Sequence, residues 1–238
     1  MGRHPYRRET PHPPGREIFV NSPNHAIAIP IMKLTLARLL QFTAVAVLSL
    51  CSTNCANVGK TNGKFSTTYD PVVQQPNNPA NVSVKLSTGA QRVYVMEGNR
   101  VLLATPCSVG TASSPTPKGN FTIYTKKMDR RRVSSPGAGY PMTYWMEFQS
   151  AYGMHWGFVK PFPCTHGCVR LPIKSAQKIF ALVRPGTPLN ISTSQPEDAT
   201  IGKTLPLLDD STMPDPPNSY MLSPQVFADA AKGKLYNF

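Results

Sequence analysis

The sequence is poor in acidic residues and has no long apolar run. Its 238 residues include 12 Asp and Glu against 25 Lys and Arg, a formal net charge of +13. The apolar stretch at residues 39–50 is interrupted by polar side chains and is shorter than the roughly 20 residues that a membrane-spanning helix needs. The sequence therefore does not predict a transmembrane helix. No internal repeat is apparent, so a repeat architecture is not expected.

The basic charge is concentrated in the middle of the chain. Residues 81–195 contain 14 Lys and Arg against 3 Asp and Glu, whereas residues 196–238 contain 3 against 6. A basic surface can meet nucleic acid, anionic lipid or an acidic polymer such as a bacterial cell wall. The densest run, KKMDRRR at residues 126–132, is either a solvated loop or a binding surface. Because no nucleic-acid-binding motif is recognisable, we expect no nucleic-acid partner.

The N-terminal third of the chain has three parts. Residues 1–31 are rich in Pro, His and Arg without periodicity, and are typical of a disordered extension or a misassigned start. Residues 32–56 place a charged entry before the apolar stretch, which indicates a signal peptide, or a lipoprotein leader with Cys51 or Cys55 as lipid carrier. We therefore expect export to the periplasm or cell envelope, with membrane contact only through the leader or a lipid anchor. Residues 57–80 are polar and predict a linker.

Residues 81–195 predict a mainly β domain. Alternating apolar residues indicate strands at 82–86 and 92–96, and the turn at residues 97–99 joins the second of these to a third strand in a hairpin. Short strands separated by Pro and Gly are typical of a β-sandwich or barrel. The later strands are expected at 101–109, 120–125, 143–148 and 188–192.

One helix is expected in this domain. Pro172 suits its first turn, an apolar stripe runs from Ile173 to Val183, and Pro185 with Gly186 ends it. Residues 196–238 form a Pro-rich tail with a possible short helix at 226–231.

The stretch MHWGFVKPFPCTHGCVRLP, residues 154–172, holds two histidines and two cysteines. All four, His155, Cys164, His166 and Cys168, are acceptable zinc ligands, but structural zinc sites usually use turn-forming pairs such as C-x2-C, and none is present. We therefore expect no metal, and no cofactor is implied. A disulfide from Cys164 to Cys168 or to Cys107 is an alternative that the sequence leaves open.

Covalent chemistry explains more of these residues. A cysteine attacks as the thiolate, and a thiol with a pKa of about 8.5 needs a neighbouring histidine or aligned backbone amides to ionise at neutral pH. His155 and His166 can supply the first requirement. Gly167, directly before Cys168, lets consecutive N–H groups turn toward one point, as an oxyanion site requires. Arg170 adds a planar cation suited to a substrate carboxylate.

Four sequence elements in order resemble a known family. THGCVRLP resembles the [ST]-H-G-C-[VI]-R-L signature of the L,D-transpeptidase catalytic (YkuD) family. HWG at residues 155–157 resembles its H-x-G element, and PTPKGNFTIYT after SVG resembles its P-T-P-x-G-x-F/Y segment. The helix and PGTPLNIS are similar to its closing helix and strand. The resemblance covers residues 82–192 and implies an L,D-transpeptidase-like β-sandwich with one short helix after the catalytic Cys motif.

The resemblance also implies roles for individual residues. Cys168 would be the acyl-accepting nucleophile and His155 its base. His166 and Gly167 would shape the oxyanion site, with the N–H groups of Gly167 and Cys168 as donors. The expected substrate-binding residues are Arg170, which could instead brace the loop, Thr165, where serine is commoner, and Trp156, where a small residue is commoner.

The implied reaction is acyl transfer on peptidoglycan stem peptides. Cys168 would attack the third stem residue, expel the terminal D-alanine and hold a thioester. An amine acceptor would give a 3-3 crosslink or attach another molecule to the wall, and water would give L,D-carboxypeptidase activity. A catalytically silent wall-binding module is the alternative, favoured if a disulfide with Cys164 caps Cys168.

Overall fold

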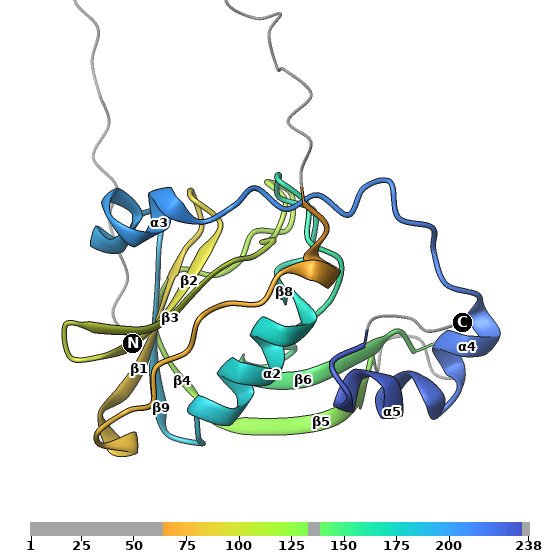
Figure 1. Cartoon of the computed structure of the whole chain (residues 1–238), viewed down its shortest axis with the longest axis horizontal. Coiled ribbons are helices and arrows are strands. Elements are labelled where there is room, and N and C mark those ends of the chain that lie inside the picture. Colours follow the sequence, from red (N-terminus) through yellow and green to blue (C-terminus); the bar gives the residue numbers. More distant parts are fainter. Residues whose placement is uncertain (1–63, 133–138, 235–238) are drawn as a thin grey trace, which may run out of the picture. The chain divides into compact units, whose positions relative to one another are not determined.

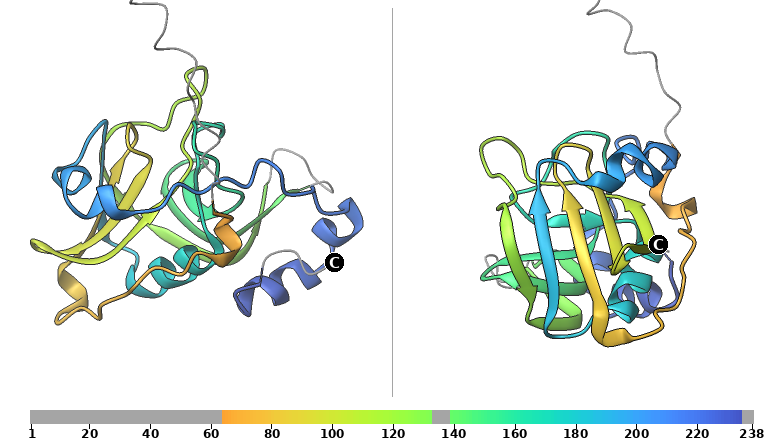
Figure 2. Two further views of the ribbon diagram at one scale, coloured as in Figure 1. Left: turned by 45° about the horizontal axis from the view of Figure 1, so that its top comes forward. Right: turned by 90° about the vertical axis from the view of Figure 1, so that its left-hand side faces the viewer.

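The first of two β-sheets has five strands in the order β3-β2-β1-β9-β4. Strands β1 and β9 run parallel, and the other neighbours are antiparallel. The right panel of Figure 2 shows this sheet, with β9 in blue next to β1 in gold. Its strands are β1 (Val82–Ser87), β2 (Arg92–Glu97), β3 (Arg100–Pro106), β4 (Gly119–Ile123) and β9 (Thr187–Ser192).

The second sheet has four strands in the order β5-β6-β7-β8, of which only β7 and β8 are parallel neighbours. Its strands are β5 (Thr125–Arg131), β6 (Pro141–Gln149), β7 (Tyr152–Trp156) and β8 (Val169–Leu171). Figure 1 shows helix α2 beside β6. The expected mainly β fold is confirmed, as is the helix that follows the cysteine motif, α2 (Ile173–Leu182).

The computed structural model describes residues 64–132 and 139–234, which belong to one unit, Lys60–Phe238. The expected extension at 1–31 and leader at 32–56 lie outside the described residues. No helix in the described part of the chain is long and apolar enough to cross a membrane.

The two sheets share one apolar core. Val82, Val84 and Leu86 alternate along β1 and contribute to it, as the sequence pattern predicted. Helix α2 packs its apolar stripe on β6 and β7, with Ile173 and Ile179 fully buried. The apolar stripe therefore fixes the helix on the sheet that carries the cysteine motif.

The first part of the tail, residues 196–205, covers the other face of the first sheet. Tyr94 points away from the main core, and its hydroxyl donates to Asp198 at 2.7 Å. A Cβ on Gly202 would lie 2.3 Å from that hydroxyl, so a glycine permits this close approach. The remaining helices of the described residues are short: η1 (Ser66–Thr68), η2 (Pro79–Asn81), η3 (Pro196–Ala199), α3 (Ile201–Thr204), α4 (Asn218–Leu222) and α5 (Gln225–Ala231).

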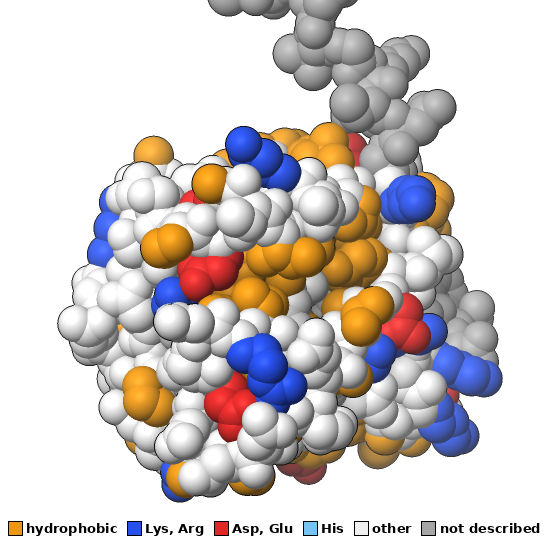
Figure 3. All heavy atoms as spheres, turned by 60° about the vertical axis from the view of Figure 1, so that its left-hand side comes forward, with side chains coloured by type: hydrophobic (Ala, Val, Ile, Leu, Met, Phe, Trp, Pro, Cys, Tyr) orange, Lys and Arg blue, Asp and Glu red, His pale blue; other side chains and the backbone are white. Residues whose placement is uncertain are grey.

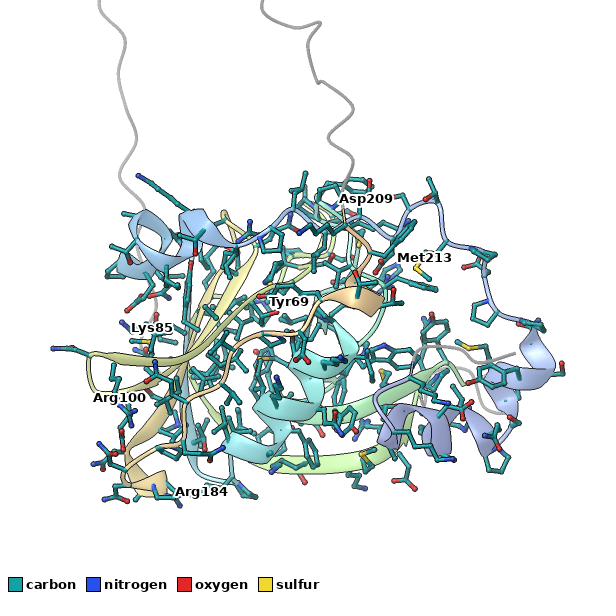
Figure 4. The ribbon with its side chains drawn as sticks, viewed as in Figure 1. Tyr69, Lys85, Arg100, Arg184, Asp209 and Met213 are labelled. Carbon is teal, nitrogen blue, oxygen red and sulfur yellow. The ribbon has the colours of Figure 1, made fainter. Side chains whose placement is uncertain are left out.

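Residues 64–80, expected to belong to a linker, contact the domain. The buried carboxylate of Asp210 accepts hydrogen bonds from the Ser66 N–H (2.8 Å) and the Val159 N–H (2.7 Å). Tyr69, labelled in Figure 4, donates its hydroxyl to the Ala104 carbonyl at 3.1 Å. Residues 64–80 and the tail are thus tied to the domain by these polar contacts.

Figure 3 shows acidic side chains next to basic ones on one face, where an apolar area is also exposed.

The basic run at 126–132 is mostly strand β5, and not the solvated loop that was one of the two interpretations of its sequence. Its charged groups pack on aromatic rings: Lys126 lies 4.2 Å from the Phe180 ring centroid, and Arg130 lies 4.6 Å from that of Trp145. Long basic side chains bury their aliphatic stems while keeping the charge in favourable contact with a ring face. Such a run can therefore form a strand that composition alone does not predict.

Candidate active site

The cysteine loop, residues 164–168, is hydrogen-bonded to the segment that connects β3 with β4 of the first sheet. The backbone N–H groups of Cys164 and Thr165 both donate to the Val109 carbonyl, at 3.0 and 3.1 Å. In return, the Thr111 N–H donates to the Thr165 carbonyl at 3.0 Å. The motif around residues 107–111 thus holds the loop that carries Cys168.

Thr116 braces this loop from a second segment. Its hydroxyl donates to the Gly167 carbonyl and accepts from the Gly110 N–H, both at 2.9 Å. The side chain is only 4% exposed, so neither bond competes with solvent. Thr116 is the middle residue of PTP, a motif that pointed to the family without revealing that it contacts the catalytic loop.

Thr165 makes two hydrogen bonds inside the loop. Its hydroxyl donates to the Cys168 carbonyl at 2.6 Å and accepts from the Gly167 N–H at 3.1 Å. The hydroxyl expected to bind substrate is thus engaged within the loop in this structure. It also occupies the Gly167 N–H, one of the two expected oxyanion donors. The other donor, the Cys168 N–H, has no acceptor among residues 64–132 and 139–234.

Gly167 adopts a backbone conformation that requires glycine. Its φ is +107°, in a region that L-residues rarely enter. A Cβ there would lie 2.3 Å from Cε1 of Tyr152. The glycine is therefore needed for two reasons, the turn before Cys168 and the close packing of Tyr152.

Cys168 is half-buried, and its thiol sulfur lies 3.7 Å from the Ala151 carbonyl, to which it donates. Burial raises the pKa of the thiol above its usual value, while a hydrogen bond from the Gly153 backbone and the Arg170 charge act in the opposite direction. The described cysteines, Cys107, Cys164 and Cys168, are all free thiols. The disulfide alternatives are not formed in this structure.

His155 lies in β7, is 4% exposed, and has Nδ1 2.6 Å from the Trp156 carbonyl oxygen. Because a carbonyl can only accept, Nδ1 carries the proton and Nε2 keeps its lone pair. Burial lowers the pKa of His155 to about 4, aided by the Arg170 charge and opposed by the bond to Trp156. At neutral pH the imidazole is therefore uncharged and able to accept a proton.

The parallel pairing of β7 with β8 brings His155 and Cys168 to the same cavity. In this register His155 pairs with Arg170, and side chains two residues apart share a face of a strand. Cys168 lies two residues before Arg170, and it lines the same cavity as His155. The cavity has a volume of about 310 Å³, and Thr165, His166 and Arg170 also line it.

Trp156 differs from its expected substrate-binding role. It is 1% exposed and belongs to the apolar core, because it follows His155 directly and so points to the opposite face of β7. It does not line the cavity. Gly167 shapes the loop beside the cavity but is not one of the residues that line it.

The other wall of the cavity comes from the hairpin of β5 and β6, which the sequence did not reveal. Its lining residues are Arg130, Arg132, Tyr140, Met142, Trp145 and, at the β6–β7 turn, Ala151. Together with Arg170, three arginines face the cavity, and no Asp or Glu is among the described lining residues. Such a site favours an anionic ligand. The alternating spacing of Arg130 and Arg132 in the basic run was the available signal.

Metal binding finds no support in the described part of the chain. No three side chains of His, Cys, Asp or Glu converge there as a metal site would require.

Comparisons with known proteins agree with the motifs. Residues 81–191 match the model of the family described as L,D-transpeptidase catalytic domain (YkuD). A curated relative, the candidate L,D-transpeptidase YkuD of Bacillus licheniformis, is 26% identical over 147 residues, which cover 58% of this chain and 82% of the relative.

Solved structures of L,D-transpeptidases are more distant. That from Stackebrandtia nassauensis is 21% identical with a TM-score of 0.44, over 52% of this chain and 60% of that chain. The Enterococcus faecium L,D-transpeptidase is 24% identical with a TM-score of 0.42, over 47% of this chain and 50% of that chain. The matched region thus spans between a half and three fifths of these solved chains.

Proposed function

We propose that this chain, whose residues 81–191 match the model of the L,D-transpeptidase catalytic domain (YkuD) family, is a peptidoglycan L,D-transpeptidase that acts through a thioester on Cys168. The observation that carries the proposal is the pairing, in one cavity, of a free thiol with a buried, uncharged histidine. The thiol and imidazole start as a neutral pair, so His155 acts as a general base at the moment of attack.

In the first half-reaction, the Cys168 sulfur attacks the carbonyl carbon of the third stem residue while its proton passes to Nε2 of His155. The Cys168 N–H is the available donor for the oxyanion that forms. When the tetrahedral intermediate collapses, the bond to the terminal D-alanine breaks. The departing amine takes the proton from His155, and a thioester remains.

In the second half-reaction, the amine of another stem peptide attacks the thioester carbonyl. His155 takes a proton from this amine, and the carbon–sulfur bond breaks as a 3-3 crosslink forms. The proton then returns to the Cys168 sulfur. Water in place of the amine gives L,D-carboxypeptidase activity, and an amine on another molecule attaches it to the wall. No cofactor takes part in this scheme.

The arginines of the cavity suit the charge of the substrate. Stem peptides carry carboxylates, and a guanidinium binds a carboxylate through two parallel hydrogen bonds. Arg170, whose backbone is tied to Ser108 on both sides (N–H to carbonyl distances of 2.9 and 3.0 Å), is a rigid candidate for this contact. Peptidoglycan also places the reaction outside the cytoplasm, consistent with the leader proposed at residues 32–56.

The test is incubation of the protein with disaccharide-tetrapeptide, followed by mass spectrometry of products and protein. Crosslinked dimer that has lost one D-alanine supports the proposal, whereas tripeptide with free D-alanine identifies a carboxypeptidase. Cys168→Ala should abolish both the acyl-enzyme and turnover. Cys107→Ala is the matched control, since that thiol is buried outside the cavity, and it should retain most activity. Absence of any product with wild-type protein would identify the catalytically silent wall-binding module.

A further inference from the structure

Glu147 is a buried carboxylate that the proposed mechanism does not use. It lies in β6 and is 8% exposed. Its Oε2 accepts from Trp145 Nε1 and from Arg130 Nη1, both at 3.1 Å, and its Oε1 accepts from the Ala151 N–H at 3.3 Å. Burial alone raises the pKa of a carboxyl, but hydrogen bonds from Trp145 and Tyr124 and the Arg130 charge outweigh it, so the pKa of Glu147 is lowered. A buried charge with this many donors is held in one position.

One of these hydrogen bonds leads to His155. The Trp145 indole packs against the His155 ring, with centroids 5.8 Å apart and an interplanar angle of 33°. A Cβ on Gly153 would lie 2.7 Å from two atoms of this indole, so a glycine is what lets the ring lie against β7. Because Glu147 fixes the indole N–H, it fixes the surface on which the His155 ring rests.

Another hydrogen bond leads to Cys168. The carbonyl of Ala151 accepts from the Cys168 thiol, and the N–H of the same residue donates to Glu147. Ala151 has a φ of +64°, a conformation that a residue with a Cβ adopts only when its surroundings hold it there. The bond to Glu147 is one such constraint, and it sets the direction of the carbonyl that meets the sulfur.

We propose that Glu147 is a positioning residue that orients both members of the catalytic pair, His155 through Trp145 and Cys168 through Ala151. The inference rests on the proposed function for the identity of the reaction. Its geometry predicts an effect on the reactivity of Cys168 itself, with or without a peptidoglycan substrate.

The test compares Glu147→Gln with Glu197→Gln in the full chain. Glu197 is a matched control: its side chain is as buried (11% against 10% exposed) and forms one ion pair, with Lys85 at 2.6 Å, away from the cavity. Four quantities are measured: the rate at which iodoacetamide alkylates Cys168, followed by peptide mass spectrometry; kcat and KM with disaccharide-tetrapeptide; and the urea midpoint.

For Glu147→Gln we expect alkylation of Cys168 and kcat to fall about tenfold with KM within about twofold, since misplaced reacting groups lower the rate of the chemical step. Glu197→Gln should keep all three kinetic values. A structural role alone predicts equal kinetic values for the two variants once each is corrected for its folded fraction, and that result would overturn the proposal.

Trp145→Phe examines the link to His155 separately, because phenylalanine keeps an aromatic ring without the N–H. It should also slow alkylation, and the double variant with Glu147→Gln should be no slower than Glu147→Gln alone. If Glu147→Gln does not fold, Trp145→Phe decides the matter. Unchanged alkylation and kcat in Trp145→Phe would overturn the proposal.

Failure of the proposed function would look different. Iodoacetamide would then alkylate Cys168 of the wild-type protein rapidly, but the protein would not convert the tetrapeptide. The effect of Glu147→Gln on the alkylation rate would remain. Conversely, wild-type turnover with identical alkylation in Glu147→Gln and Glu197→Gln would overturn only the role of Glu147.

Discussion

Acidification should destabilise the fold through His155 between pH 6.5 and pH 4. The ordinary pKa of this histidine is 6.5 and burial lowers it to about 4 in the folded protein. Within that window the unfolded chain binds a proton that the folded protein does not, so the free energy of unfolding falls as the pH falls. At about 1.36 kcal/mol per pKa unit, acidification from pH 7 to pH 4.5 should remove about 2 kcal/mol through this group.

The matched variant is His155→Asn, whose amide can still donate to the Trp156 carbonyl while lacking a titratable ring. Urea unfolding, followed by the fluorescence of Trp145 and Trp156, gives the free energy of unfolding at pH 7 and at pH 4.5. Carboxylates contribute to both proteins alike, so wild type should lose about 2 kcal/mol more than the variant. Equal losses would show that the pKa of His155 is not lowered, and would remove the basis for an uncharged base at neutral pH.

Five further substitutions test contacts in the cysteine loop and in the tail. Gly167→Ala should destabilise the fold by about 3 kcal/mol and abolish activity. The control is Gly186→Ala, which is also at positive φ (+96°) but has open space around it, so it should cost about 1 kcal/mol and keep activity. Equal urea midpoints for the two variants would contradict the clash with Tyr152. Thr116→Val should cost about 1–3 kcal/mol and lower kcat, with Thr116→Ser close to wild type in both measurements. Arg131→Ala removes hydrogen bonds to three carbonyls of residues 221–223 and should speed amide exchange across residues 218–231, measured by mass spectrometry; unchanged exchange would argue against this clamp.

The sequence predicted the local elements well because their signals are local. Alternation identified β1 and β2, the turn at residues 97–99 identified their continuation into β3, and an apolar stripe bounded by proline identified α2. Strand β5 was not predicted, because its pattern is charged. Its stability comes from pairing with β6 and from aromatic rings elsewhere in the chain, such as Phe180.

The roles within the cysteine motif illustrate the same limit. The sequence singled out Cys168, His155 and Gly167 because a nucleophile, a base and a tight turn each need a particular residue type, and the structure places the first two at one cavity and gives Gly167 a positive φ. The placement of Trp156 in the core was not, since it depends on which face of β7 meets the other sheet. The hydroxyl of Thr165 could have faced a substrate or the loop, and only the folded loop shows that it bonds to the backbone.

The sequence by itself therefore determined the chemistry available to this protein, a cysteine and a histidine within a family motif, and the elements that carry them. Only the tertiary structure decided the surroundings of that chemistry: the brace from Thr116, the arginine wall on the hairpin of β5 and β6, and the carboxylate of Glu147. The reason is physical. Residue type and periodicity specify what a side chain can do and which face of its own element it occupies, whereas its partners come from strands and loops distant in the chain, and only packing brings these within hydrogen-bonding distance.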